Sequence, residues 1–226
     1  MKKRYILFIY LLSSACICFS QNESDTRTNS NFFSEMSNNS LSTFANYDKK
    51  IKGSPYIQKH YSPIKISGFS NNDLSAKYNA HQDFFKIIKN GTVKHFTTNN
   101  SQTITFTSNN KSYKSFLFED KKTFFVLNYE DSNFIVLTKE TISLTDAIKP
   151  QTGYDSYTPA KFHRKKDRYY MKMKNEDVIK IDRSKKRFLK NFKDKKKLVK
   201  KYIKANKLNH KNEKDLIGIL KYYYTI

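Results

Sequence analysis

A run of lysines near the C-terminus is the densest group of charged side chains in the sequence. Residues 193–207 (KDKKKLVKKYIKANK) contain eight lysines in fifteen positions. At about 100° per residue, five of these lysines fall on one side of a helical wheel and four apolar residues on the other. The apolar arc comprises Leu198, Val199, Tyr202 and Ile203. The pattern predicts an amphipathic surface helix with a candidate anion-binding face, whose members are Lys196, Lys197, Lys200, Lys201 and Lys204.

The basic excess belongs to the C-terminal third of the chain. Residues 161–226 hold 24 Lys+Arg and 7 Asp+Glu, and 20 of those cations are lysine. Lysine is a point charge, whereas arginine supplies the planar fork that reads phosphates and bases bidentately. A solvated charged face, or lysine enrichment in a low-GC genome, is the simpler alternative explanation of the run. Specific nucleic-acid binding is therefore not expected.

The histidines show no pattern of metal ligation. No pair has the i, i+4 or short-loop spacing that metal sites favour. His81 and Asp83 are two residues apart and would share one face of a strand, so a weak metal site is an alternative to a half-exposed strand histidine. The sequence predicts no metal and no cofactor. The five histidines are His60, His81, His95, His163 and His210.

Catalytic patterns are equally sparse. The sequence has no Gly-x-Ser-x-Gly elbow and no glycine-rich phosphate loop, since its five glycines are dispersed. The adjacent acids Glu119-Asp120 and Glu130-Asp131 indicate turns rather than an acid/base couple. We therefore assign no catalytic residue and expect a non-enzymatic protein. The alternative is an enzyme or enzyme-associated domain that acts on an envelope polymer.

The N-terminus is typical of a secretory signal peptide. Three cationic residues precede a short apolar run and then small residues, which predicts a signal at residues 1–20 and cleavage after Ser20. Lipidation at Cys16 is the alternative. Cys16 and Cys18 are the two cysteines, so the mature chain would contain none. We expect an exported protein without a transmembrane helix after signal removal, located in the periplasm, at the outer membrane or outside the cell.

The rest of the chain divides by composition. Residues 21–48 are rich in Asn and Ser and predict a flexible leader, in which a short helix near Phe32–Phe44 could dock through its aromatics. Residues 49–145 alternate apolar and polar positions between turn signals such as Asn90-Gly91, which predicts a β-rich domain. Residues 146–160 contain two prolines and a glycine and predict a linker or surface loop.

Residues 161–226 predict a basic β-hairpin followed by helices. The hairpin turns near Asn175-Glu176-Asp177, and the pattern then changes to a helical period. Ser184 and Asp194 are candidate caps for two helices, and Asn212 with Asp215 for a third. The expected fold is therefore α+β: an antiparallel β-meander, barrel-like or a rolled sheet, followed by a hairpin and a small C-terminal helical subdomain.

Three short motifs resemble a family of exported proteins. They are GSPY (residues 53–56), KYNAHQD (residues 77–83) and DLIGILKYYY (residues 215–224). Together with Tyr169-Tyr170 they resemble an uncharacterised family of small exported Bacteroidota-type proteins, over about residues 50–226. The sequence departs from the family at Lys77, where arginine is common, and at His81, where tyrosine is. The resemblance implies export and a β-then-α order, and it carries no activity.

These observations together predict an envelope protein that binds or supports a partner. The expected partner is an anionic envelope component, such as a phosphorylated lipid or acidic polysaccharide, or another envelope protein. A purely structural role, with lysines serving only solubility, is the remaining possibility.

Overall fold

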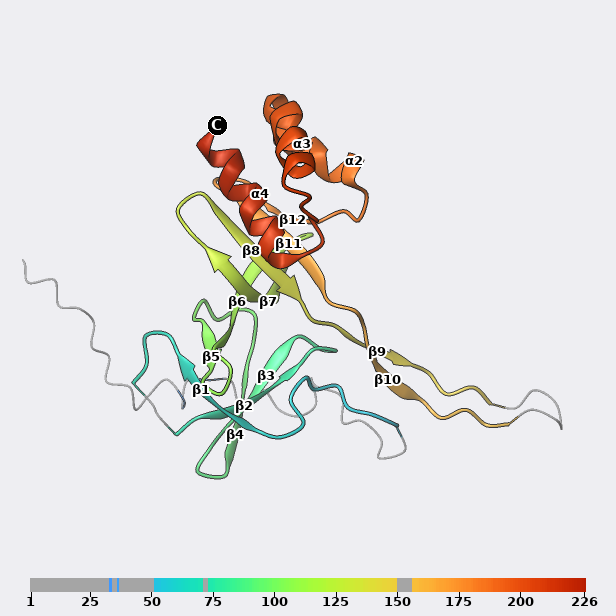
Figure 1. Ribbon diagram of the computed structural model, residues 1–226. Coiled ribbons are helices and arrows are strands. Elements are labelled where there is room, and N and C mark those ends of the chain that lie inside the picture. The colour runs from blue at the N-terminus through green and yellow to red at the C-terminus, as the bar shows by residue number, and fades with distance from the viewer. Residues whose placement is uncertain (1–32, 34–35, 37–50, 71–72, 150–155) are drawn as a thin grey trace, which may run out of the picture.

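The computed structural model describes residues 33, 36, 51–70, 73–149 and 156–226. Ten strands build its main sheet, with helices packed against one face (Figure 1). The strands are β1 (Ser62–Ile66), β2 (Ser75–Asn79), β3 (Phe84–Lys89), β4 (Thr92–Phe96), β5 (Ile104–Phe106), β6 (Lys111–Phe118), β7 (Lys121–Glu130), β8 (Phe134–Lys139), β11 (Arg168–Met173) and β12 (Val178–Lys180).

The sheet is an open antiparallel meander. Its strand order is β12-β11-β8-β7-β6-β5-β1-β2-β3-β4, so β12 and β4 are edges that do not pair with each other. The predicted α+β class, with a β-meander before the helices, is confirmed. The barrel-like alternative is not formed by the described residues, because the sheet does not close.

Left-handed residues make the tight turns of this meander. Asn90 and Gly91, between β3 and β4, have φ angles of 48° and 77°. A two-residue hairpin turn of this type requires positive φ at both positions, so the predicted turn is confirmed. Glu119 and Asp120 have φ angles of 49° and 61° and form the same kind of turn between β6 and β7. This acidic pair thus serves a turn, as its sequence position predicts.

The second acidic pair also lies at a turn. Glu130 ends β7, and the Asp131 carboxylate accepts hydrogen bonds from the backbone N–H groups of Asn133 and Phe134 at 2.8 and 2.9 Å. An aspartate that bonds backbone two residues ahead mimics a backbone turn. The side chain therefore fixes the reversal between β7 and β8.

Aromatic and aliphatic side chains form separate buried clusters along the sheet. The first cluster is formed mainly by residues of β1–β7, joined by Met36, Ile142 and Phe162. It includes the stacked rings of Tyr78 and Phe85, with centroids 4.8 Å apart. The second joins β8 and β11 to the helices, and a smaller third covers the other face of these strands. Antiparallel strands favour such aromatic pairs. The helices are therefore held by the end of the sheet that contains β8 and β11, and the part built from β1–β7 has a separate core.

A two-stranded ribbon projects from this body (Figure 1). It consists of β9 (Ile142–Thr145) and β10 (Lys161–Arg164), and Ile148 and Thr158 bridge further along it. The segment 146–160, predicted as a linker or surface loop, thus connects the two paired strands of one hairpin. Residues 150–155 within it lie outside the described part of the chain.

Four helical segments follow β12. They are α2 (Lys185–Phe188), the 3₁₀ helix η1 (Leu189–Lys195), α3 (Lys196–Ala205) and α4 (Glu213–Thr225). Asn212 caps α4 by accepting a hydrogen bond from the Asp215 backbone N–H at 3.2 Å, as predicted. The prediction that Asp194 caps a helix is wrong. Lys193 has φ 44° and ψ −125°, so the chain kinks there and α3 begins only at Lys196.

The predicted N-terminal segments fall almost entirely outside the described residues. The signal at 1–20, with Cys16, lies outside them, and the leader at 21–48 is described at Phe33 and Met36 only. Met36 is buried in the first cluster, and Phe33 packs against that cluster. No helix among the described residues is both long enough and apolar enough to cross a membrane.

Candidate anion-binding surfaces

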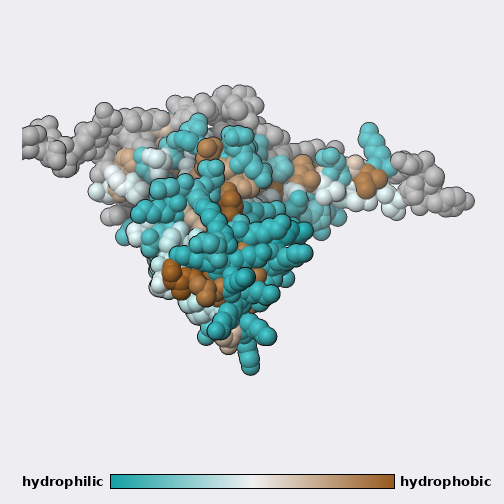
Figure 2. Space-filling model, turned by 90° about the horizontal axis from the view of Figure 1, so that it is seen from above, coloured by the Kyte–Doolittle hydropathy of each residue, from teal (hydrophilic) through white to brown (hydrophobic). Residues whose placement is uncertain are grey.

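Helix α3 carries the five lysines that the sequence predicts as a basic surface. All five side chains are exposed, and we call Lys196, Lys197, Lys200, Lys201 and Lys204 the lysine face. The opposite side of α3 is anchored by Val199 and Ile203, which are 0% and 1% exposed and belong to the second buried cluster. Figure 2 looks onto the helical end of the molecule and shows hydrophilic residues over most of it.

The predicted apolar arc of α3 is only half correct. Val199 and Ile203 are one turn apart and pack into the cluster with α4, but Leu198 is 50% exposed. Leu198 precedes the buried Val199 in the sequence, so it is rotated from it by about 100° around the helix axis and reaches only the flank of the contact. The contact of α3 with its neighbours is narrower than the arc of four residues, so Leu198 remains at its edge.

Tyrosine stacking fixes the outer edge between α3 and α4. The rings of Tyr202 and Tyr222 are stacked with centroids 3.9 Å apart and an interplanar angle of 6°. Tyr222 of α4 thus contacts α3. The stack holds the lysine face in a fixed orientation relative to α4.

The lysine face is not explained by helix stability. Among the described residues its five members form no ion pair, and the first turn of α3 contains no acidic residue. Cations at the N-terminus of a helix oppose its macrodipole, which favours acidic residues there. Lys196 and Lys197 in the first turn therefore cost the helix a little stability, whereas Lys204 in the last turn is favoured there. All five charges are left free for anions from solution.

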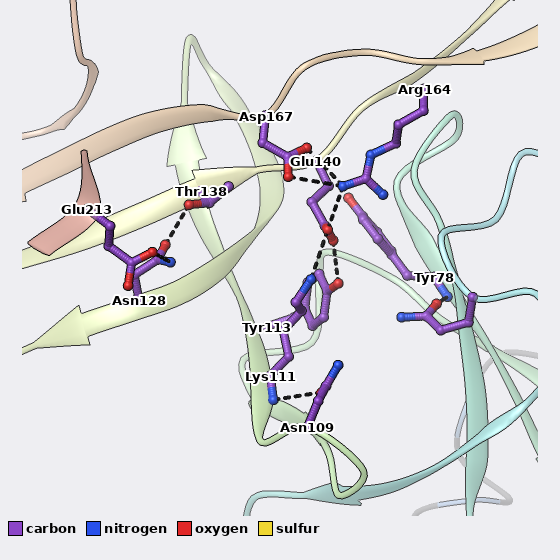
Figure 3. Close-up of polar contacts among 11 residues, drawn as sticks. Tyr78, Asn109, Lys111, Tyr113, Asn128, Thr138, Glu140, Arg164, Asp167 and Glu213 are labelled. Carbon is purple, nitrogen blue, oxygen red and sulfur yellow. Dashed lines mark hydrogen bonds and ion pairs between the residues drawn. The ribbon is translucent and has the colours of Figure 1, made fainter. Parts of the chain in front are cut away.

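The most buried ionised group of the described chain lies elsewhere, at the end of β8. The Glu140 side chain is 1% exposed and accepts hydrogen bonds from Tyr113 Oη, from Lys111 Nζ at 3.0 Å and from an Arg164 terminal nitrogen at 2.8 Å (Figure 3). Burial would raise the pKa of Glu140, but these bonds and the Lys111 charge lower it below its usual range. Arg164 also pairs with Asp167, at 2.9 Å.

A second buried cluster is centred on Lys139. Its Nζ donates to Asp83 Oδ1 at 2.7 Å, to the Tyr78 hydroxyl at 2.9 Å and to the Phe124 carbonyl at 2.9 Å. Tyr78 in turn donates to Asp83 at 2.5 Å. Burial lowers the pKa of Lys139, and the Asp83 charge opposes that shift. Every acid and base in these two clusters is engaged by its neighbours, so the two clusters join strands of the main sheet to one another and to the ribbon.

A polar chain also ties the helices to the sheet. The Thr138 hydroxyl donates to the Asn128 amide oxygen at 2.7 Å, and the Asn128 amide nitrogen donates to Glu213 at 2.8 Å (Figure 3). Glu213 is the first residue of α4. An acid is favoured at this end of a helix, and here it also fixes where α4 meets β7 and β8.

The five histidines remain dispersed in the structure. His81 and Asp83 lie in the turn after β2 rather than on a strand, and His81 Nδ1 lies 3.2 Å from the Ile142 carbonyl oxygen. His210 is buried, stacks on Phe188 and contacts the Asp182 carbonyl oxygen at 3.0 Å. Within the described ranges no group of three His, Cys, Asp or Glu residues is placed to hold a metal ion.

Sequence reasoning missed a cleft at the open end of the β11–β12 hairpin. It consists of two adjoining hollows of about 670 and 290 Å³, which share Arg168, Ile181 and Arg183. We call it the arginine cleft, and its cationic residues are Lys166, Arg168, Lys180, Arg183, Arg187 and Lys211. They come from three separate stretches of the chain, 166–168, 180–187 and 211, so no local spacing reveals the whole set. The available signal was arginine usage, since four of the six arginines lie within residues 164–187.

Comparisons of this chain with protein-family models, with curated proteins and with solved structures found no match.

Proposed function

We propose that this protein is a non-enzymatic binding module of the cell envelope that attaches to anionic surfaces through the lysine face. The observation that carries the proposal is the rigid display of five exposed lysines on α3, which form no ion pair among the described residues. The location in the envelope rests on the N-terminal segment, whose pattern is that of a secretory signal.

The expected affinity follows from simple electrostatics. Each cation close to an anionic surface contributes about 1 kcal/mol, and the attraction decays over a Debye length of about 10 Å at 0.1 M salt. Five such lysines would together contribute about 5 kcal/mol, which corresponds to a dissociation constant of about 0.2 mM, and this binding weakens steeply as salt rises. Because charge alone produces this attraction, phosphorylated lipids and acidic polysaccharides should bind with similar affinity.

Vesicle co-sedimentation tests the proposal. The purified protein should bind phosphatidylglycerol vesicles at low salt and should not bind phosphatidylcholine vesicles. The triple variant Lys200→Gln, Lys201→Gln, Lys204→Gln should bind about 100-fold more weakly, since it loses three surface contacts of about 1 kcal/mol each. Its melting temperature should hardly change, because the three side chains are exposed.

A matched variant separates the lysine face from total charge. Lys65, Lys121 and Lys122 are exposed on the sheet, and their replacement by glutamine removes the same three charges. The proposal requires this variant to keep most of its vesicle binding. Equal loss in both variants, or no binding at low salt, would reduce the lysine face to a solubility feature.

A further inference from the structure

The arginine cleft has the charge of an anion site. Six cationic side chains line its two hollows, and the carboxylates that also line them are Asp167 and Asp182. Both carboxylates are already engaged. Asp167 accepts from Arg164 at 2.9 and 3.1 Å, and Asp182 accepts from Arg187 Nε and from the Ser184 backbone N–H, each at 2.6 Å.

The cations of the cleft are largely uncompensated. Lys166, Arg168, Lys180, Arg183 and Lys211 form no ion pair within the described part of the chain. Arg187 uses Nε–H for Asp182, and a guanidinium carries further N–H donors on its terminal nitrogens. Like charges gathered around one hollow repel each other weakly through water, and a bound anion would relieve that repulsion.

Codon bias does not explain which cations line the cleft. The chain contains 43 Lys+Arg, of which six are arginine. Three of those six, Arg168, Arg183 and Arg187, line the cleft. A low-GC genome enriches lysine, so a cluster of arginines runs against that trend. Arginine is the residue that binds phosphate bidentately through its planar fork.

The cleft is held by regular structure. Arg168 begins β11, and the Ile181 backbone N–H bonds the Tyr169 carbonyl at 3.0 Å, which closes the hairpin beneath the cleft. His210 contacts the Asp182 carbonyl oxygen, so the loop with Lys211 is fixed beside the same hairpin. Tyr169 lines the larger hollow, and its phenol, which is protonated at neutral pH, carries a further hydrogen-bond donor.

We propose that the arginine cleft binds a small ligand that carries two phosphate groups, one in each hollow. Arg168 and Arg183 lie at the boundary that both hollows share, and they contact both groups. Lys166 and Lys211 complete the larger hollow, while Lys180 and Arg187 complete the smaller one. The volume of the larger hollow suits a ligand of sugar-phosphate size. This site is separate from the lysine face and does not depend on the function proposed for it.

Calorimetric titration with inorganic pyrophosphate tests the site, at physiological salt where weak surface attraction is screened. Pyrophosphate should bind at least about 10-fold more tightly than inorganic phosphate, because it presents a second phosphate group to Arg168 and Arg183 at the boundary that the hollows share. The double variant Arg168→Gln, Arg183→Gln should lower pyrophosphate affinity at least about 100-fold, since it removes two charge-assisted contacts. Both arginines are exposed, so circular dichroism and the melting temperature should show an intact fold.

Two matched variants complete the test. Lys200→Gln with Lys204→Gln removes the same charge from the lysine face and should leave pyrophosphate binding unchanged. Arg183→Lys keeps the charge but loses the fork, and should weaken binding about 10-fold. Absence of pyrophosphate binding at millimolar concentration, equal affinity for phosphate, or equal loss in the lysine-face variant would each overturn the proposal. Vesicle binding by the cleft variant reports separately on the lysine face.

Discussion

The charged side chains around β8 and those on the helical end of the molecule differ in burial and in pairing. Glu140 is buried and Lys139 is largely buried, and each is surrounded by partners from distant parts of the chain. The lysine face and most cations of the arginine cleft are exposed and form no ion pair among the described residues. An uncompensated charge is tolerated in water but costs several kcal/mol when buried. The first set of charges therefore serves the fold, and the second is available for binding.

Removal of the Glu140 charge should give the largest effect on stability. Glu140→Gln leaves Lys111 and Arg164 facing an amide, so we expect a loss of about 3 to 5 kcal/mol in the free energy of unfolding, measured by urea denaturation. The matched change Glu130→Gln breaks an exposed pair with Lys114 and should cost less than about 1 kcal/mol. Similar losses in both variants would erase the distinction between the two kinds of charge.

A pair of helix variants tests the orientation of the lysine face. Ile203→Ala removes a buried side chain and should cost about 2 to 4 kcal/mol, whereas Leu198→Ala removes the same number of carbons from an exposed edge and should cost less than about 0.5 kcal/mol. Thermal unfolding of both variants measures the difference. If Leu198→Ala proved the more destabilising change, α3 would be rotated and the lysine face would point elsewhere.

A smaller effect should appear on the acid side of the stability curve. The folded-state pKa of Glu140 lies below its unfolded value, so its stabilisation is complete above an unfolded pKa of about 4.3 and is lost as the pH falls through the folded pKa. Urea denaturation between pH 5 and pH 2 should therefore show a shallower loss of stability for Glu140→Gln than for the unchanged protein. Parallel curves would mean that Glu140 does not titrate differently in the two states.

Local patterns predicted the elements well and the polar contacts poorly. The Asn90-Gly91 turn and the Asn212 cap depend on neighbouring residues, so the sequence indicates them directly. The partners of Glu140 lie up to 29 positions away and come from β6 and from the ribbon. No periodicity places Lys111 or Arg164 beside it.

The two basic surfaces also differ in how far the sequence can predict them. The lysine face lies on one helix, so a helical wheel predicts it from the sequence. The exposed Leu198 shows that the wheel does not predict where the packing contact of that helix ends. The arginine cleft needs the ends of β11 and β12 and the loop before α4 to meet. That meeting depends on strand pairing and helix docking, and a linear sequence gives no direct sign of it.

The strand order has a consequence for how the chain acquires its fold. Taken in chain order, β2, β3 and β4 each add to the strand before, β5 adds to the free edge of β1, and β6 to β8 extend that edge. Strands β11 and β12 then continue from β8. No strand has to enter between two that are already paired. A polypeptide that emerges from a narrow pore with its N-terminus first can therefore add one strand at a time to an edge of the growing sheet. Strands that have already paired do not need to separate.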